Sequence, residues 1–296
     1  MRPPTNESYH GRSEASDLRE YGGVPKSKVG SVVSLWRYPV KSMMGEELDT
    51  ADLTHRGLLG DRAYALMDSD GKVASAKSSR KWARLLGFRA ALMEPPHAGE
   101  TIPPVRITLP DGMTVGDEQS NLDRILSGVI GREVTLSTTT PGTPVLRYEY
   151  DRPDVDSLNH AGKASEHPVL EGTFFDAAVV HVLTTAPIGR FRELYPRDRF
   201  EERRFRPNVI VETSRGEKGF VENDWVGHTL TIGEEVRLSV TGPCLRCVMV
   251  NLSQGGLTND PGILRTAVRH NEGGAGVYAA VLRGGTIRRG DPVELD

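Results

Sequence analysis

Residues 240–250 read Val-Thr-Gly-Pro-Cys-Leu-Arg-Cys-Val-Met-Val, and they contain both cysteines of the 296-residue chain, Cys244 and Cys247. The apolar alternation of Val236–Val240 predicts a strand that runs into Gly242-Pro243. The flanks on both sides are rich in β-forming residues, whereas a redox dithiol with C-x-x-C spacing is expected in a βαβ context. This segment therefore favours a mainly β fold with the cysteine pair at a strand end.

The cysteine spacing leaves four interpretations open. A redox dithiol fits the spacing but not the flanks. A structural zinc site needs four ligands, and the sequence has no second cysteine pair. The two cysteines could also be buried and inert. In the fourth interpretation, a single thiolate binds a soft metal, with Arg246 beside it.

Short β-rich runs separated by turn residues continue outward from this segment in both directions. Predicted strands are Val29–Trp36, Arg62–Met67, Val105–Leu109, Met113–Val115, Val134–Ser137, Ala177–Thr184, Asn208–Glu212, Thr229–Ile232, Val236–Val240, Tyr278–Leu282 and Ile287–Leu295. Predicted helices are Arg80–Leu86 after a Ser79 cap, Asn121–Ile130, Ala186–Tyr195 after a Thr185 cap, and Gly262–Arg269. Closely spaced strands with few helices predict a mainly β, α+β protein built from barrels and not from a doubly wound sheet.

The chain divides into three parts. Residues 1–28 are polar, without apolar periodicity, and are predicted to form a disordered tail. A loop-rich stretch with four prolines spans residues 138–172 and is the natural boundary between two folded parts. We therefore expect an N-terminal β-barrel domain over residues 29–140 and a C-terminal domain over residues 165–296.

Composition argues against several classes of protein. The net charge of -3 and the pI of about 6.3 are not those of a general nucleic-acid binder. Two cysteines are too few for a disulfide scaffold or a four-thiolate iron–sulfur cluster. The apolar runs are too short to cross a bilayer, and the N-terminus lacks the apolar region of a secretory signal. We expect a cytoplasmic protein without nucleic-acid or membrane partners.

Five blocks, in this order, resemble the MOSC domain family and the N-terminal β-barrel that precedes it in amidoxime-reducing component proteins. They are Leu35-Trp-Arg-Tyr-Pro-Val-Lys-Ser42, Gly57-Leu-Leu-Gly-Asp-Arg62, Phe205-Arg-Pro-Asn208, Cys244-Leu-Arg-Cys247 and Gly290-Asp-Pro-Val293. The resemblance covers nearly all of the chain from Val29 to Asp296. It implies a MOSC-type β-barrel preceded by a β-barrel-like domain, and a molybdenum cofactor (molybdopterin).

The resemblance also implies roles for individual residues. The second cysteine of the Cys-x-Arg-Cys block, Cys247, would be the metal ligand and the catalytic residue, since thiolate is a soft, strongly donating ligand. Arginine suits a cofactor phosphate because its planar fork donates two hydrogen bonds at once. The predicted cofactor-binding residues are Lys41, Ser42, Arg62, Thr184, Thr185, Arg206, Asn208 and Tyr278, with Ser75 and Lys77 as weaker candidates.

Structural alternatives stay open for several of these residues. Lys41 fits a surface turn, and Asp61-Arg62 fits an ordinary turn. Thr184 and Thr185 stand where a strand opens a helix, which suits an anion but equally suits a helix cap. Tyr278 fits an ordinary strand aromatic.

The family resemblance implies an oxidoreductase that reduces N-hydroxylated small molecules such as amidoximes. Some relatives carry a C-terminal ferredoxin-like module with four cysteines, and this sequence lacks one. We therefore expect electrons from a separate donor protein of the flavin, iron–sulfur or haem type. One alternative is a sulfur carrier, or a binder of sulfurated molybdenum cofactor, that uses a persulfide on Cys247. Another is a β-barrel binding module without a cofactor.

Overall fold

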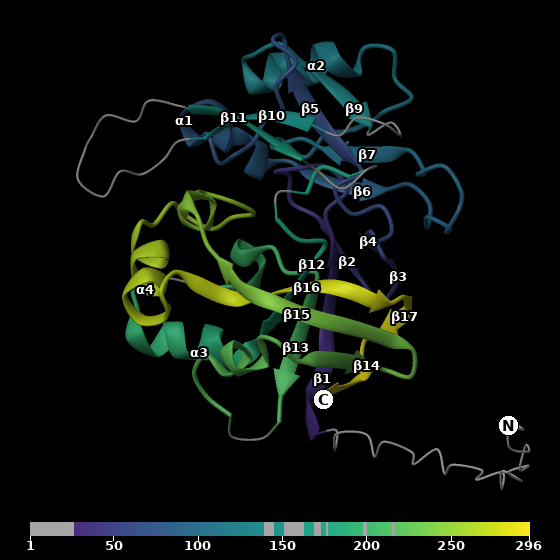
Figure 1. The fold of residues 1–296 in the computed structure, drawn as a ribbon. Coiled ribbons are helices and arrows are strands. Elements are labelled where there is room, and N and C mark those ends of the chain that lie inside the picture. Colours follow the sequence, from purple (N-terminus) through teal and green to yellow (C-terminus); the bar gives the residue numbers. More distant parts are fainter. Residues whose placement is uncertain are drawn as a thin grey trace, which may run out of the picture.

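The computed structural model describes residues 27–138, 145–150, 163–168, 173–175, 177–197, 200–214 and 217–296. This part of the chain is mainly β, with four α-helices and four short 3-10 helices, which confirms the predicted fold class. Figure 1 shows its two units, a group of small sheets above and a barrel with flanking helices below. The predicted tail lies outside the described residues, except that its last two residues open the first strand.

A closed barrel of seven strands forms the larger unit. Each strand hydrogen-bonds to the next, and the first and last members pair to close the ring. In order around the ring, the strands are β13 (Val209–Thr213), β12 (Val180–Thr184), β16 (Gly274–Arg283), β15 (Val236–Leu245), β14 (Thr229–Ile232), β18 (Pro292–Leu295) and β1 (Ser27–Arg37). All pairings are antiparallel except β12 with β13. A short strand, β2 (Glu46–Leu48), adds to β1 beyond the ring.

Side-chain alternation explains how the barrel fills its interior. In β15, Val236, Leu238 and Val240 are buried in the barrel core, and the residues between them are only partly buried. This period of two places one face of each strand inward. The strand β12 is buried along its whole length, because the helical layer covers its outer face.

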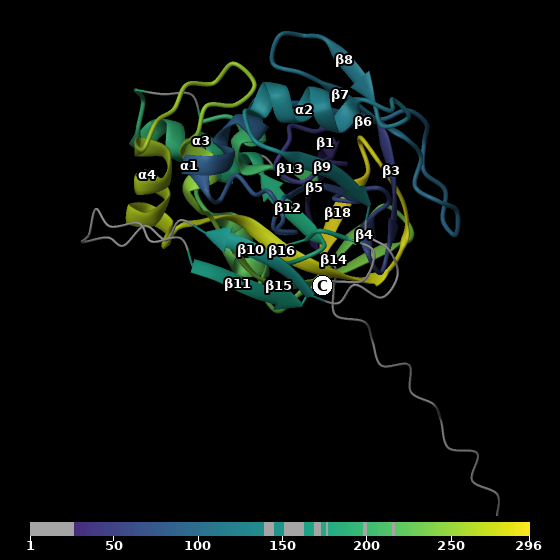
Figure 2. The same cartoon turned by 90° about the horizontal axis from the view of Figure 1, so that it is seen from above.

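The strand β1 enters the barrel from the opposite end of the sequence. It pairs with β13 and with β18, so residues near position 30 lie beside residues near positions 212 and 293. Figure 2 shows this strand among those of the barrel when the molecule is viewed from above. An N-terminal strand thus completes the C-terminal barrel, which was not expected. The expected domain bounds, residues 29–140 and 165–296, stay predictions.

The smaller unit consists of short sheets around its own apolar core. They pair β5 (Tyr64–Asp68) with β9 (Val134–Thr138), and β6 (Arg89–Leu92) with β7 (Val105–Thr108), which also pairs with β8 (Thr114–Gly116). The helices are α1 (Ser79–Trp82), which continues as η1 (Ala83–Gly87), and α2 (Leu122–Ile130). Between the two units, β3 (Thr50–Thr54) pairs with β4 (Gly57–Leu58) and β17 (Gly285–Arg288).

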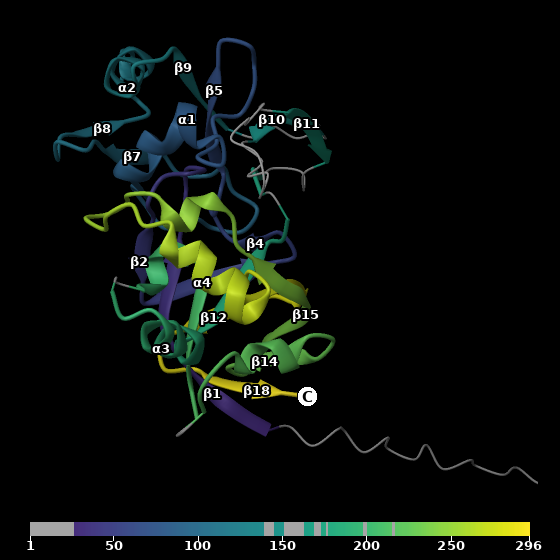
Figure 3. The same ribbon diagram turned by 90° about the vertical axis from the view of Figure 1, so that its left-hand side faces the viewer.

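Helices cover one side of the barrel. The elements of this layer are α3 (Thr185–Leu194), α4 (Gly262–Asn271), η2 (Glu202–Phe205), η3 (Val221–Trp225) and η4 (Val248–Asn251). Figure 3 shows α3 and α4 side by side on this face. Phe191, Phe200 and Phe205 stack in their shared core. None of the helices in the described ranges is long and apolar enough to span a membrane.

The predicted elements need four corrections. The strand expected over Ile287–Leu295 is two strands, because Asp291 accepts a hydrogen bond from the Arg288 amide and closes a turn. The helix expected over Arg80–Leu86 is an α-helix only up to Trp82 and continues as a 3-10 helix from Ala83. The caps are displaced by one residue, to Ser78 and Thr184, and neither makes a side-chain capping bond.

The fourth correction concerns the stretch over residues 138–172 that was expected to be loop-rich. It contains a strand pair, β10 (Val145–Tyr150) with β11 (Lys163–Pro168). Four further short strands, β2, β3, β4 and β6, were also missed.

Candidate functional site

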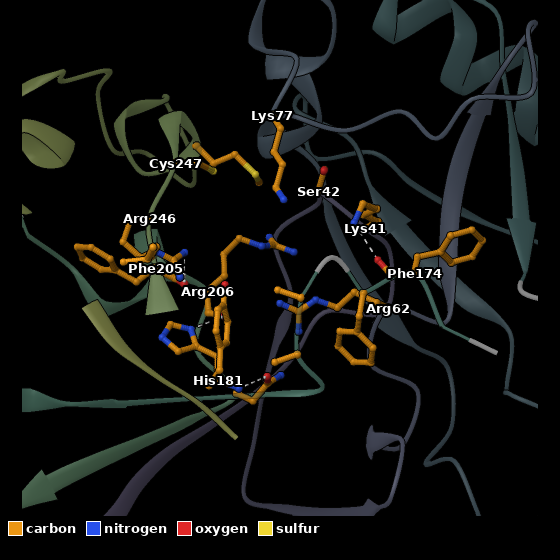
Figure 4. Close-up of a pocket in the computed structure, with 17 residues that line it drawn as sticks. Lys41, Ser42, Arg62, Lys77, Phe174, His181, Phe205, Arg206, Arg246 and Cys247 are labelled. Carbon is orange, nitrogen blue, oxygen red and sulfur yellow. Dashed lines mark hydrogen bonds between the residues drawn. The ribbon is translucent and has the colours of Figure 1, made fainter. Parts of the chain in front are cut away.

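A cavity of about 150 Å³ brings together seven of the nine predicted site residues. The seven are Lys41, Ser42, Arg62, Arg206, Asn208, Cys247 and Tyr278. They come from both units: the loop between β1 and β2, the loop between β4 and β5, the segment before β13, the segment after β15, and β16. Figure 4 shows five of them, Lys41, Ser42, Arg62, Arg206 and Cys247, around one space.

The cavity wall is strongly positive. Five cationic side chains line it, and no carboxylate does among the described residues. The cations are Lys41, Arg62, Lys77, Arg206 and Arg246. In Figure 4, Lys77 and Arg206 point into the same space as Cys247. Clustered guanidinium and ammonium groups in a wall to which no described residue adds a carboxylate suit an anionic ligand such as a phosphate.

Backbone strain is concentrated at the same place. Only four non-glycine residues in the described part of the chain have positive φ, and three of them line the cavity: Ser42 (φ 65°), Arg62 (φ 50°) and Arg206 (φ 52°). This conformation costs an L-residue with a Cβ roughly 1–2 kcal/mol. Strain of this kind is retained mostly where it places a side chain or backbone group for a ligand.

Two arginines of the wall pack on a single aromatic ring. The guanidinium carbons of Arg62 and Arg206 lie 4.5 and 4.2 Å from the ring centroid of Tyr38. Tyr38 is buried and donates from its hydroxyl to the Pro207 carbonyl at 3.2 Å. Burial and the nearby charge of Arg62 lower the pKa of Arg206 to about 10, so this arginine stays protonated at neutral pH.

Lys41 and Ser42 are fixed by contacts on the N-terminal side. The ammonium group of Lys41 donates to the Phe174 carbonyl at 2.8 Å, and the hydroxyl of Ser42 accepts a hydrogen bond from the Ala76 amide at 3.0 Å. Both residues are 4% exposed. The Ser42 hydroxyl therefore keeps its own proton as a donor, and neither residue forms the surface turn that the sequence left open.

Asn208 contacts protein groups with both ends of its amide. Its Nδ2 donates to Asp61 at 2.9 Å and to the Trp36 carbonyl at 3.3 Å, and its Oδ1 accepts from the His181 amide at 3.1 Å. Both donors are used, so one lone pair of Oδ1 is the remaining capacity for a ligand.

The two cysteines face different surroundings. Cys247 is partly exposed and lines the cavity, whereas Cys244 is fully buried and does not. Arg246 donates to the Cys244 sulfur and, at 2.8 Å, to the Phe205 carbonyl, while its Nε is buried without a hydrogen-bond partner among the described residues. No three His, Cys, Asp or Glu side chains in the described ranges are placed to hold a metal ion. A metal at Cys247 would therefore need ligands brought by a cofactor.

Thr184 and Thr185 do not line the cavity. Thr184 is fully buried, and its hydroxyl donates to Glu222 at 2.9 Å. Thr185 borders a separate open hollow together with residues of β1 and β13. The strand end that opens α3 thus uses its hydroxyl for a buried carboxylate.

His181 also lines the cavity, and sequence reasoning missed it. Its ring nitrogens lie 3.0 Å from the Ala275 carbonyl and 3.4 Å from the Arg206 carbonyl, and its ring meets Tyr278 edge-on. Burial, together with the charge of Arg246, lowers the pKa of His181 to about 3, so the imidazole is neutral. Phe174, Phe175 and Phe205 were missed as well, because an aromatic residue in a loop has no distinctive spacing.

Comparisons with known proteins match both units. Residues 169–294 match the family model of the MOSC domain, and residues 29–95 match that of the MOSC N-terminal beta barrel domain. Mitochondrial amidoxime reducing component 2 from Homo sapiens is 24% identical over 297 residues, with 90% of this chain and 83% of the relative covered.

Molybdenum cofactor sulfurase from Homo sapiens is 24% identical over 269 residues, and the match covers 82% of this chain. The chain spans only 29% of the length of that relative. The crystal structure of the YUAD protein from Bacillus subtilis has a TM-score of 0.46 and 12% identity, with 92% of this chain and 97% of that chain covered.

Proposed function

Since the chain carries a MOSC domain preceded by a MOSC N-terminal β-barrel domain, we propose that it binds a molybdenum–pterin cofactor through Cys247 and reduces N-hydroxylated small molecules. One observation carries this proposal: the only cysteine sulfur that lines the cavity shares it with five cationic side chains and no carboxylate, among the described residues. A soft thiolate beside phosphate-binding cations is the donor set that such a cofactor requires.

The residues present fit this group in a second respect. The Nε of Arg246 is buried without a partner in the described part of the chain, which costs free energy unless a ligand accepts its hydrogen bond. When bound, the cofactor would supply two-electron redox chemistry that no side chain here provides.

The chain's own residues would bind and orient. Cys247 would ligate the metal. Arg62 and Arg206, held on the Tyr38 ring, would receive the phosphate of the pterin with Lys41. The Ser42 hydroxyl would donate one further hydrogen bond. The aromatic rings of Phe174, Phe175 and Phe205 would exclude water from the bound group.

One relative supports the proposed substrate class. Mitochondrial amidoxime reducing component 2, at 24% identity over 90% of this chain, favours a reductase of N-hydroxylated compounds. We propose that a separate flavin, iron–sulfur or haem protein supplies the electrons.

The proposal is tested by purifying the protein from a host competent in cofactor synthesis and measuring molybdenum and pterin per chain. We expect a stoichiometric content of both, loss of molybdenum in Cys247→Ala, and retention in the matched variant Cys244→Ala. Equal molybdenum in wild type and Cys247→Ala would refute ligation by this sulfur. Reduction of a simple aromatic amidoxime by loaded protein and a chemical reductant would then test the substrate class.

A second candidate is a sulfur carrier that holds a persulfide on Cys247. The match to molybdenum cofactor sulfurase over 82% of this chain and the partial exposure of Cys247 favour it. In that case the purified protein would lack molybdenum, and mass spectrometry would detect one added sulfur atom that a reductant removes. The Cys247→Ala variant would lack this addition.

A further inference from the structure

Asp61 does not line the cavity, yet its carboxylate contacts groups that build it. The residue is 2% exposed, and its Oδ1 accepts a hydrogen bond from the Tyr38 amide at 2.7 Å. Its Oδ2 accepts from the Asn208 amide group at 2.9 Å and from the Arg62 guanidinium. One buried carboxylate thus satisfies three donors from three segments of the chain.

We propose that Asp61 is the positioning residue of this site, which aims Arg62 at an anionic ligand without touching that ligand. The inference rests on the proposed function, since it concerns how the same pocket holds the anionic end of a cofactor.

Electrostatics gives the first reason. Arg62 and Arg206 both pack on the Tyr38 ring, and their like charges repel each other. No lining side chain of the described residues offers a carboxylate to offset them. Asp61 stands behind Arg62, and its side chain is fully buried, so solvent does not screen the pair. Without Asp61, this repulsion would move the Arg62 side chain away from Arg206 and from the ligand.

Connectivity gives the second reason. Asp61 lies in the loop between β4 and β5, whereas Asn208 precedes β13 and donates to Asp61 while accepting from the His181 amide in β12. The relay from Arg62 through Asp61 and Asn208 to His181 ties an arginine of the N-terminal segment to the barrel wall. The arginine is therefore fixed relative to Cys247, which the barrel side supplies.

A conservative variant separates positioning from folding. Asp61→Asn keeps the shape and the acceptor for the Tyr38 amide, but it places an NH₂ group where Arg62 and Asn208 both need an acceptor. The matched control is Asp52→Asn, which removes one negative charge from an exposed residue of β3 that contacts Thr286. Full-length protein from a host that lacks the cofactor is titrated with inorganic pyrophosphate by calorimetry, and thermal unfolding is followed in parallel.

We expect Asp61→Asn to weaken pyrophosphate binding about tenfold, as for the loss of one charge-assisted hydrogen bond, and Asp52→Asn to leave it unchanged. Because Asp61 acts through Arg62, the double variant with Arg62→Ala should bind no more weakly than Arg62→Ala alone. Binding that stays equal or tightens in Asp61→Asn would overturn the inference, because the residue would then act only as a negative charge. Fully additive losses, or no pyrophosphate binding by wild type, would overturn it as well.

Molybdenum and pterin contents of the same variants from a competent host separate this inference from the proposed function. If wild type contains molybdenum and pterin and Asp61→Asn contains as much of both, only the positioning role is refuted. If the losses of pyrophosphate binding in Asp61→Asn and Arg62→Ala are non-additive but the protein never acquires molybdenum, only the proposed cofactor is refuted.

Discussion

Arg246 donates a hydrogen bond to the sulfur of Cys244, and its other terminal nitrogen donates to the Phe205 carbonyl at 2.8 Å. The first cysteine of the pair therefore holds the arginine, while the second, Cys247, faces the cavity. This division of roles gives a physical reason for the Cys-x-Arg-Cys order: one sulfur faces inward as an acceptor, and the arginine joins it to the neighbouring η2 segment.

Replacing Cys244 should affect anion binding more than metal binding. In Cys244→Ala, Arg246 loses an acceptor, so pyrophosphate affinity should fall by about threefold to tenfold, while molybdenum content stays that of wild type. Cys244→Ser retains an acceptor and should recover part of the affinity. Calorimetry and metal analysis measure the two effects, and equal affinities in all three proteins would contradict the anchoring role.

Gly276 is enclosed by β12. A Cβ at this position, where φ is +80°, would lie 2.4 Å from Nε2 of His181 and 2.5 Å from the Val182 carbonyl oxygen. Gly276→Ala should therefore lower the free energy of unfolding by roughly 2–4 kcal/mol, from overpacking added to backbone strain. The matched control is Gly256→Ala, with φ +81° and open space around it, which carries the strain alone. Urea denaturation measures both, and equal losses would contradict the steric argument.

Two variants of Arg206 separate the role of its side chain from the free-energy cost of its backbone conformation. Its φ of 52° favours glycine, so Arg206→Gly should be more stable than Arg206→Ala by about 1 kcal/mol. Both variants lose the cation and its hydrogen bond to the Met43 carbonyl, so pterin retention should fall equally in both. Denaturation and pterin fluorescence test the two halves of this prediction. Cofactor retention as in wild type would show that the side chain is structural.

Glu222 should make stability depend on pH. Burial raises its pKa from 4.5 to about 7, while it accepts hydrogen bonds from Thr184 and from the Gly276 amide. Its contribution is fully present below pH 4.5 and is lost as pH rises toward 7, because the unfolded chain releases the proton first. The free energy of unfolding of wild type should fall relative to Glu222→Gln by on the order of 1–3 kcal/mol across this window. Denaturation on both sides of the window checks it, and parallel pH curves would count against it.

Local sequence patterns predicted much of the fold, and seven of the nine site residues that the family resemblance implied line one cavity. The alternation of Val236, Leu238 and Val240 marks an inward face, and Gly131 ends α2 in the left-handed conformation expected of a C-cap. Lys41, Arg62 and Cys247 are far apart in sequence, so the matched blocks, and not their spacing, indicated that they share a cavity.

What escaped prediction depends on contacts between distant segments. The hydroxyl of Thr184 had two plausible uses at a helix start, and only the folded position of Glu222 decides between them. Asn208 was expected to bind pterin, but its donors are taken by Asp61 and the Trp36 carbonyl, which no local pattern reveals. The ring of His181 contacts the carbonyls of Arg206 and Ala275, which lie 25 and 94 residues away in sequence, so no local pattern marks it.

The pairing of β1 with β13 and β18 sets a condition on biosynthesis. Residues 27–37 leave the ribosome well before their neighbours at 209–213 and 292–295. The nascent chain must therefore keep an unpaired strand from misassociating until both of its neighbours have been synthesised. A fragment that begins at residue 165 would lack this strand and expose two open edges, so we expect it to aggregate unless a peptide of residues 27–37 is supplied in trans.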